Sequence, residues 1–155
     1  MAHYSLSLLV FLSFPIFSET VLVPGKPYLW KGAKILVPTK SVMVEENDKI
    51  RIFPKEKEPF FLVLRSLPKG KKLDWEEWNT KGIWKDLDVR TSVEETVLGS
   101  CKIRKAKQVR SYHEIQTEVW FCTRQEEGYW IWLSYELDDQ DLGSFFERRR
   151  FLEGN

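Results

Sequence analysis

Residues Glu118–Leu137, EVWFCTRQEEGYWIWLSYEL, contain two apolar segments separated by the polar run Arg124–Gly128. A short polar loop that ends in glycine, placed between two such segments, predicts a β-hairpin. If residues 126–127 form the tip of the loop, Phe121 lies opposite Trp132 across the hairpin. We expect the rest of the chain to pack in layers around this pair of strands.

Side chains alternate between two faces along a strand, so this hairpin has two distinct surfaces. One face carries Trp120, Cys122, Tyr129, Ile131, Leu133 and Tyr135. The other face carries Val119, Phe121, Trp130 and Trp132. Because both faces are apolar near the turn, the hairpin either lies in the middle of a β-sandwich or leaves one aromatic face open for a partner. A one-residue slip in the loop would exchange the two faces. We expect Trp130 and Trp132 to fill the core.

The amino-terminal residues 1–18 predict a cleaved secretory signal. Met1–Tyr4 has no acidic residue, Ser5–Phe17 is apolar and uncharged, and Ile16 and Ser18 suit the −3 and −1 positions of a cleavage site. The apolar run is shorter than the ~20 residues of a membrane-spanning helix. Residues 19–155 then form a single β-rich domain, secreted and without stable membrane insertion. The alternative is a buried amino-terminal strand or helix.

Composition favours an all-β binding domain. Aromatic residues make up 14 % of the chain, with seven tryptophans. The formal net charge is +1, so bulk electrostatics do not indicate nucleic acid as a partner.

The two cysteines, Cys101 and Cys122, predict one disulfide in a secreted chain. A bridge that closes about twenty residues contributes roughly 3 kcal/mol in the loop-entropy model. The alternative is two buried thiols, if the chain is not exported. Two cysteines and the single mature histidine, His113, give no spaced ligand set for zinc, and we expect neither a metal nor a cofactor.

The rest of the chain predicts short antiparallel strands and a terminal helix. The predicted strands cover residues 20–23, 34–37, 41–44, 49–53, 59–66, 89–93, 96–104 and 108–122. Strands 41–44 and 49–53 form a hairpin, and 59–66 is apolar enough to be buried on both faces. Ser144–Glu147 fits a capping box and predicts a short helix packed on the sheet, with Gly154 as its C-cap. The fold class is therefore an antiparallel β-sandwich, or alternatively a closed β-barrel, with a short C-terminal helix.

Two groups of residues are candidate ligand contacts. The first is a basic turn at residues 102–107, which could bind sulfate groups of an extracellular glycan through Lys102, Arg104, Lys105 and Lys107. The second is an aromatic loop at residues 75–84, which could stack on sugars or anchor a protein through Trp75, Trp78 and Trp84. The alternatives are a solvated hairpin tip for the basic group and a lid over the core for the tryptophans.

Residues Glu136–Asp141, ELDDQD, resemble the Glu-Ile/Leu-Asp-x-x-Glu signature of laminarinase-type (family 16) glycoside hydrolases. The last acid is Asp141 where that family has glutamate. The resemblance implies carboxylates that alternate on one strand face and serve as nucleophile and acid/base. Ser111 and His113 would also share a strand face, but the chain has no Gly-x-Ser-x-Gly elbow.

A secreted β-rich chain with one disulfide and a late helix is also similar in outline to lipocalins, which carry small apolar ligands in a barrel. Lipocalins are expected to show Gly-x-Trp near the mature start, whereas here Gly25 and Trp30 are farther apart. A cavity lined by Trp130 and Trp132 would favour such a carrier.

The sequence as a whole predicts a secreted, non-enzymatic β-sandwich that recognises an extracellular protein or sulfated glycan through the aromatic loop and the basic turn. A lipocalin-like carrier is the first alternative, and a glycoside hydrolase-like enzyme is the second.

Overall fold

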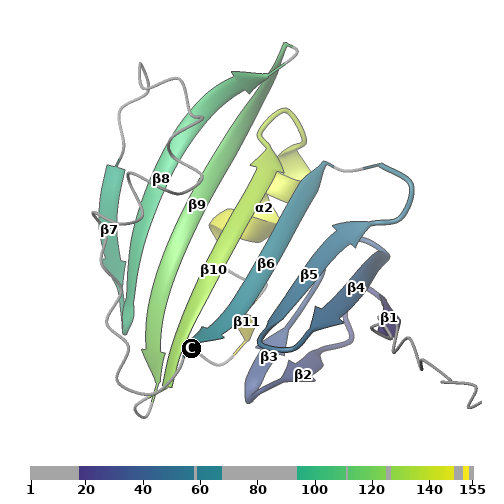
Figure 1. Ribbon diagram of the computed structural model, residues 1–155. Helices are drawn as coiled ribbons and strands as arrows, with labels where there is room; N and C mark the ends of the chain where they lie inside the picture. The colour runs from purple at the N-terminus through teal and green to yellow at the C-terminus, as the bar shows by residue number, and fades with distance from the viewer. Residues whose placement is uncertain are drawn as a thin grey trace, which may run out of the picture.

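The structure is a computed structural model, which describes residues 18–57, 59–67, 94–110, 112–124, 127–148 and 152–153. Eight strands form one antiparallel sheet in the order β1-β4-β5-β6-β10-β9-β8-β7 (Figure 1). Their bounds are β1 (Ser18–Leu22), β4 (Ser41–Glu46), β5 (Lys49–Pro54), β6 (Phe60–Leu67), β7 (Glu94–Leu98), β8 (Cys101–Arg110), β9 (His113–Arg124) and β10 (Glu127–Glu136).

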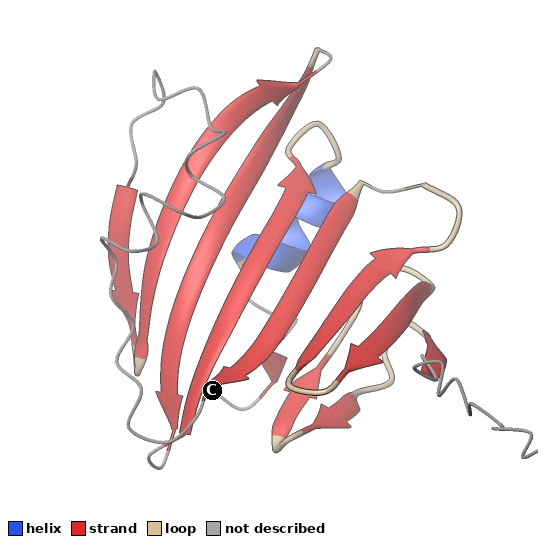
Figure 2. Ribbon diagram, in the orientation of Figure 1, coloured by secondary structure: helices blue, strands red, loops and turns tan. Residues whose placement is uncertain are grey.

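A second layer covers one face of this sheet (Figure 2). It consists of helix α2 (Gln140–Glu147) and a small sheet of the strands β2 (Tyr28–Trp30), β3 (Ala33–Ile35) and β11 (Leu152–Glu153). We call the covered side of the main sheet the helix face and the other side the opposite face. Among the described strands, β1 and β7 are the two edges of the main sheet and do not pair with each other. The sandwich-like all-β prediction with a C-terminal helix is therefore confirmed, and the closed-barrel alternative is wrong.

The core lies between the two layers. It includes residues of the small sheet, of the main sheet and of the helix, such as Trp30, Ile52, Leu133 and Phe146. The ring of Phe146 lies with its centroid 4.9 Å from that of Tyr135 and so ties the helix to the sheet. The small sheet is held by polar contacts as well, because the indole N–H of Trp30 donates to Glu45 Oε1 at 3.1 Å.

The β9–β10 hairpin forms as predicted, but its register is different. Phe121 pairs with Trp130 instead of Trp132, because regular pairing continues to residues 124 and 127 and leaves only 125–126 as the connection. Gly128 therefore lies within β10, where a Cβ would come within 3.3 Å of Leu67 Cβ. The shift moves each pairing partner by two residues, which preserves the predicted faces. The prediction that residues 59–66 form a strand buried on both faces holds only for the middle of β6, because residues 62–64 are buried whereas Arg65 is exposed.

The terminal helix begins earlier than predicted. The carboxylate of Asp139 accepts hydrogen bonds from the backbone N–H groups of Asp141 and Leu142, so the helix starts at Gln140 and not after Ser144. It ends at Glu147 with Arg148 as the C-cap, so the predicted C-cap at Gly154 is wrong. Leu142 and Phe146 are buried, as the predicted packing on the sheet requires.

The strand boundaries around Cys101 also differ from the prediction. Residues 96–104 do not form one strand, because Gly99 adopts a φ of 54° and Gly99–Ser100 make the turn between β7 and β8. Residues 102–107 are not a turn but lie within β8, and the true β8–β9 connection is at residues 111–112. The basic residues are strand residues, and this fixes the face on which each one lies.

The predicted disulfide between Cys101 and Cys122 is confirmed. The two residues pair directly across β8 and β9, and the S–S distance is 2.01 Å. In the described part of the chain, no helix is both long and apolar enough to cross a membrane.

The predicted β4–β5 hairpin is confirmed and carries a network of ion pairs. Asn47 takes a φ of 45° in the turn, as asparagine tolerates. The Arg65 guanidinium donates to Asp48 Oδ2 at 2.8 Å and holds the pKa of that carboxyl below its usual value. Hydrogen bonding to Lys49, together with the charge of Arg51, likewise lowers the pKa of Glu46.

We predict that replacing both cysteines by serine lowers the free energy of unfolding by about 3 kcal/mol, because the bridge restricts the unfolded chain. The measurement is urea unfolding of the oxidised wild type and of the Cys101→Ser/Cys122→Ser variant. Reduced wild type serves as the control and should match the variant. Equal stability of oxidised wild type and variant would show that the bridge contributes nothing.

Acid should destabilise the β4–β5 hairpin. A carboxyl whose pKa is lowered in the folded state contributes stability above its unfolded pKa, and this stability is lost as the pH falls through the folded pKa. Asp48→Asn should therefore lower the Tm at pH 7 and leave less further loss between pH 5 and pH 3. Glu56→Gln, at an exposed position, is the control. If the Tm of Asp48→Asn falls as much between pH 5 and pH 3 as the Tm of the wild type does, the Asp48 carboxylate does not contribute to the loss of stability in acid.

Candidate functional site

A cavity of about 390 Å³ lies at the β7–β8–β9 end of the main sheet, beside the last residue of α2. The described residues that line it are mostly polar: Glu94, Lys105, Ala106, Lys107, Gln116, Glu118, Tyr135 and Glu147. The volume is that of a typical small-molecule site. We call this cavity the polar cleft.

Strand pairing builds the floor of the polar cleft. Lys105 of β8 lies opposite Glu118 of β9, and Lys107 lies opposite Gln116. All four side chains share the helix face with Trp120, because positions two apart in a strand point to the same side. The cleft is therefore a polar continuation of the surface that forms the core.

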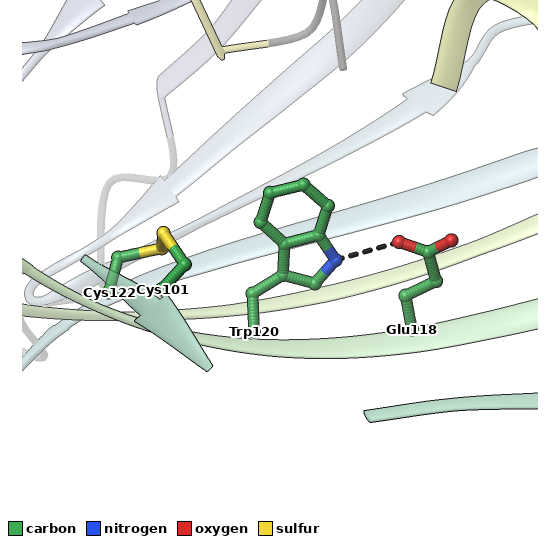
Figure 3. The surroundings of a disulfide bond; sticks show 4 residues. All are labelled: Cys101, Glu118, Trp120 and Cys122. Carbon is green, nitrogen blue, oxygen red and sulfur yellow. Dashed lines mark hydrogen bonds between the residues drawn. A yellow bond between two sulfur atoms is a disulfide. The ribbon is translucent and has the colours of Figure 1, made fainter. Parts of the chain in front are cut away.

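Glu118 is the most buried charged residue of the cleft, with 2 % of its surface exposed. Its Oε2 accepts the indole N–H of Trp120 at 2.8 Å, and its Oε1 accepts the Tyr135 hydroxyl at 3.4 Å (Figure 3 shows the Trp120 contact). Lys105 Nζ lies 3.6 Å from Oε1. A buried carboxylate is stable only with such partners, so these contacts fix its position.

Gln116 lies two residues before Glu118 on the same face. Only 6 % of its surface is exposed, and it borders the polar cleft. Within the described part of the chain, its side-chain amide has no hydrogen-bond partner. An amide offers both a donor and an acceptor, so Gln116 presents unused hydrogen-bonding capacity to whatever enters the cleft.

The charges of the cleft nearly balance. Among the described lining residues, two ammonium groups, on Lys105 and Lys107, face three carboxylates, on Glu94, Glu118 and Glu147, which gives these residues a formal charge of −1. The two outer carboxylates belong to exposed residues at the rim, whereas Glu118 is at the floor. Such a mixture can hydrogen-bond to a polar ligand but does not form a concentrated field of one sign.

The four predicted basic residues lie on two opposite faces of the sheet. Lys105 and Lys107 line the polar cleft, but Lys102 and Arg104 point to the opposite face of the sheet, because they alternate with them along β8. The single basic patch expected from a turn is therefore absent among these four residues. The predicted aromatic contacts Trp75, Trp78 and Trp84 lie outside the described residues.

Trp130 and Trp132 belong to the opposite face. Trp130 is buried there with Val63, Ala106 and Val119, and Trp132 packs against this cluster. Neither tryptophan lines the polar cleft, so the arrangement that would have favoured an apolar carrier is not found at this cavity.

The hydrolase-like run does not extend along a strand. Glu136 is the last residue of β10, and Asp139 caps α2. Asp138 Oδ2 lies 3.2 Å from His113 Nδ1, with both side chains about half exposed. These acids therefore do not alternate on one strand face. Ser111 lies outside the described residues, and in the rest no group of three or more His, Cys, Asp or Glu side chains could hold a metal.

Sequence reasoning missed Gln116, Glu118 and Tyr135 as site residues. The alternating pattern of residues 108–122 suggested a solvated polar side that included Gln116 and Glu118. The sequence did contain a signal for them. Gln116 and Glu118 are an even number of residues from the core residues Trp120 and Cys122, so they point to the same face of β9. A polar residue in line with core positions indicates either a satisfied buried group or a site.

No protein-family model matches the chain, and the search of curated proteins finds no significant match. The functional argument therefore rests on the residues themselves.

We predict that Glu118→Leu lowers the free energy of unfolding by about 2–4 kcal/mol, because Trp120 loses its hydrogen-bond acceptor and Lys105 loses its ion-pair partner. Glu118→Gln should cost about 1 kcal/mol, since the amide oxygen can still accept the indole N–H. Urea unfolding of both variants provides the measurement. Equal losses would show that the hydrogen bond from Trp120 is unimportant.

Proposed function

We propose that this chain is an exported, non-enzymatic binding protein that recognises an extracellular glycan through the polar cleft. The observation that carries the proposal is Gln116, a buried amide without a partner in the described part of the chain, at the wall of a cavity of about 390 Å³. The amide atoms of Gln116 are accessible from the cleft, so a ligand there can donate to the amide oxygen and accept from its NH₂ group.

Export is supported by the apolar leader and by the disulfide. Disulfides persist in oxidising compartments and are rare in the cytosol. Cys101 and Cys122 are bridged in the structure. The compartment and the ligand are separate parts of the proposal and can be tested separately.

A glycan is preferred to a protein because of the size and shape of the site. Stable protein interfaces bury about 800 Å² on each partner, whereas the polar cleft is a small concave site. It is preferred to an apolar ligand because charged and amide side chains supply most of the lining.

The export test expresses the full chain in secretory eukaryotic cells. We expect the protein in the medium to begin at Glu19 and to contain no titratable thiol. Material that begins at Met1 and carries two free thiols would contradict export.

The ligand test applies the secreted protein to an array of immobilised neutral, acidic and sulfated glycans. We expect retention of a subset that shares a terminal sugar. Retention of none, together with saturable binding to a purified cell-surface protein, would replace the glycan by a protein partner.

Heparin chromatography tests the basic residues specifically. Because Lys102 and Arg104 lie on the face opposite Lys105 and Lys107, we predict elution from heparin below 150 mM salt, since few charges contact the polymer at once. Elution well above that salt concentration would instead indicate a continuous cationic surface.

A further inference from the structure

We infer that the polar cleft selects a neutral, hydroxyl-rich sugar unit and discriminates against its sulfated derivatives, with Gln116 as the principal contact. This inference rests on the proposed function and specifies the ligand of the same site. The hydrogen-bond donors, the acceptors and the charges of the cleft support this inference.

The side-chain amide of Gln116 suits two neighbouring hydroxyl groups. Its oxygen accepts one hydrogen bond, and its NH₂ group donates another from an adjacent position. A hydroxyl group both donates and accepts, so adjacent hydroxyls on a sugar ring can satisfy both ends of the amide at once. The amide is held in place by burial, which reduces the entropy lost when a ligand binds.

The pair of Lys105 and Glu118 offers further contacts at fixed positions. Glu118 is anchored by Trp120 and Tyr135, and Lys105 Nζ lies 3.6 Å from its oxygen, beyond hydrogen-bonding distance. The ammonium N–H groups of Lys105 can therefore donate to a ligand hydroxyl without breaking a short hydrogen bond. Lys107 adds a second ammonium group at the exposed mouth of the cleft.

The charges disfavour an anionic ligand. A sulfate or carboxylate group in the cleft would lie among the carboxylates of Glu94, Glu118 and Glu147. A neutral hydroxylated ring avoids this repulsion and still uses the mixed donors and acceptors.

The test compares matched sugars on the secreted full chain by nuclear magnetic resonance. The probes are glucose, galactose, mannose and N-acetylglucosamine, followed by the 6-sulfate of glucose. The readout is the indole N–H resonance of Trp120, which reports on Glu118 directly and is assigned with Trp120→Phe. We expect at least one neutral sugar to shift this resonance saturably, and glucose 6-sulfate to bind at least threefold more weakly than glucose.

The variants separate binding from folding. Gln116→Met keeps the length of the side chain but removes both hydrogen bonds, so we expect about tenfold weaker sugar binding. Gln108→Met is the matched control, since it makes the same change on β8 on the opposite face, and binding should stay within twofold. Lys107→Met changes an exposed residue that cannot disrupt the core and should weaken binding a few-fold.

Three results would overturn the inference. Tighter binding of glucose 6-sulfate than of glucose would reject the neutral-sugar preference. Unchanged affinity in a folded Gln116→Met variant would reject its role as the principal contact. Glycan retention on the array without a shift of the Trp120 resonance would place the glycan elsewhere, and the proposed function would then survive while this inference fails.

Discussion

The strict alternation of side chains along β9 is the constraint on which the rest of the structure depends. Trp120 and Cys122 occupy the helix face, where one fills the core and the other is bridged to β8. The same alternation requires Glu118 and Gln116 to point inward as well. The strand cannot turn these polar residues to solvent without also exposing the indole ring, so the fold must accommodate them.

The accommodation takes two forms. For Glu118, the fold supplies an indole N–H, a hydroxyl group and an ammonium group, which together offset the cost of burying a carboxylate. For Gln116, the described part of the chain supplies space and no hydrogen-bond partner. The core and the polar cleft are therefore consecutive parts of one surface, and the rigidity of the first holds the second in shape.

Much of the fold could be predicted from the sequence, because the period of two in residues 118–137 is unambiguous. The hairpin faces, the bridge between Cys101 and Cys122, and the late helix all follow from local patterns. The hairpin register and the helix start could not be predicted, because they depend on the space left beside Leu67 and on the capping by Asp139. The polar cleft could not be predicted from local patterns either. Its described residues come from β7, β8, β9, β10 and α2, and only tertiary packing brings them together.

The two carboxylates at the rim of the polar cleft lie at positions where the amino acid can change with little loss of stability. Glu94 is on an edge strand and Glu147 closes a helix, and both are exposed to solvent. Substitutions at exposed positions usually change stability by less than about 0.5 kcal/mol. Descendants of this chain could therefore exchange rim charges freely and acquire new preferences, while selection on the floor of the pocket preserves the architecture.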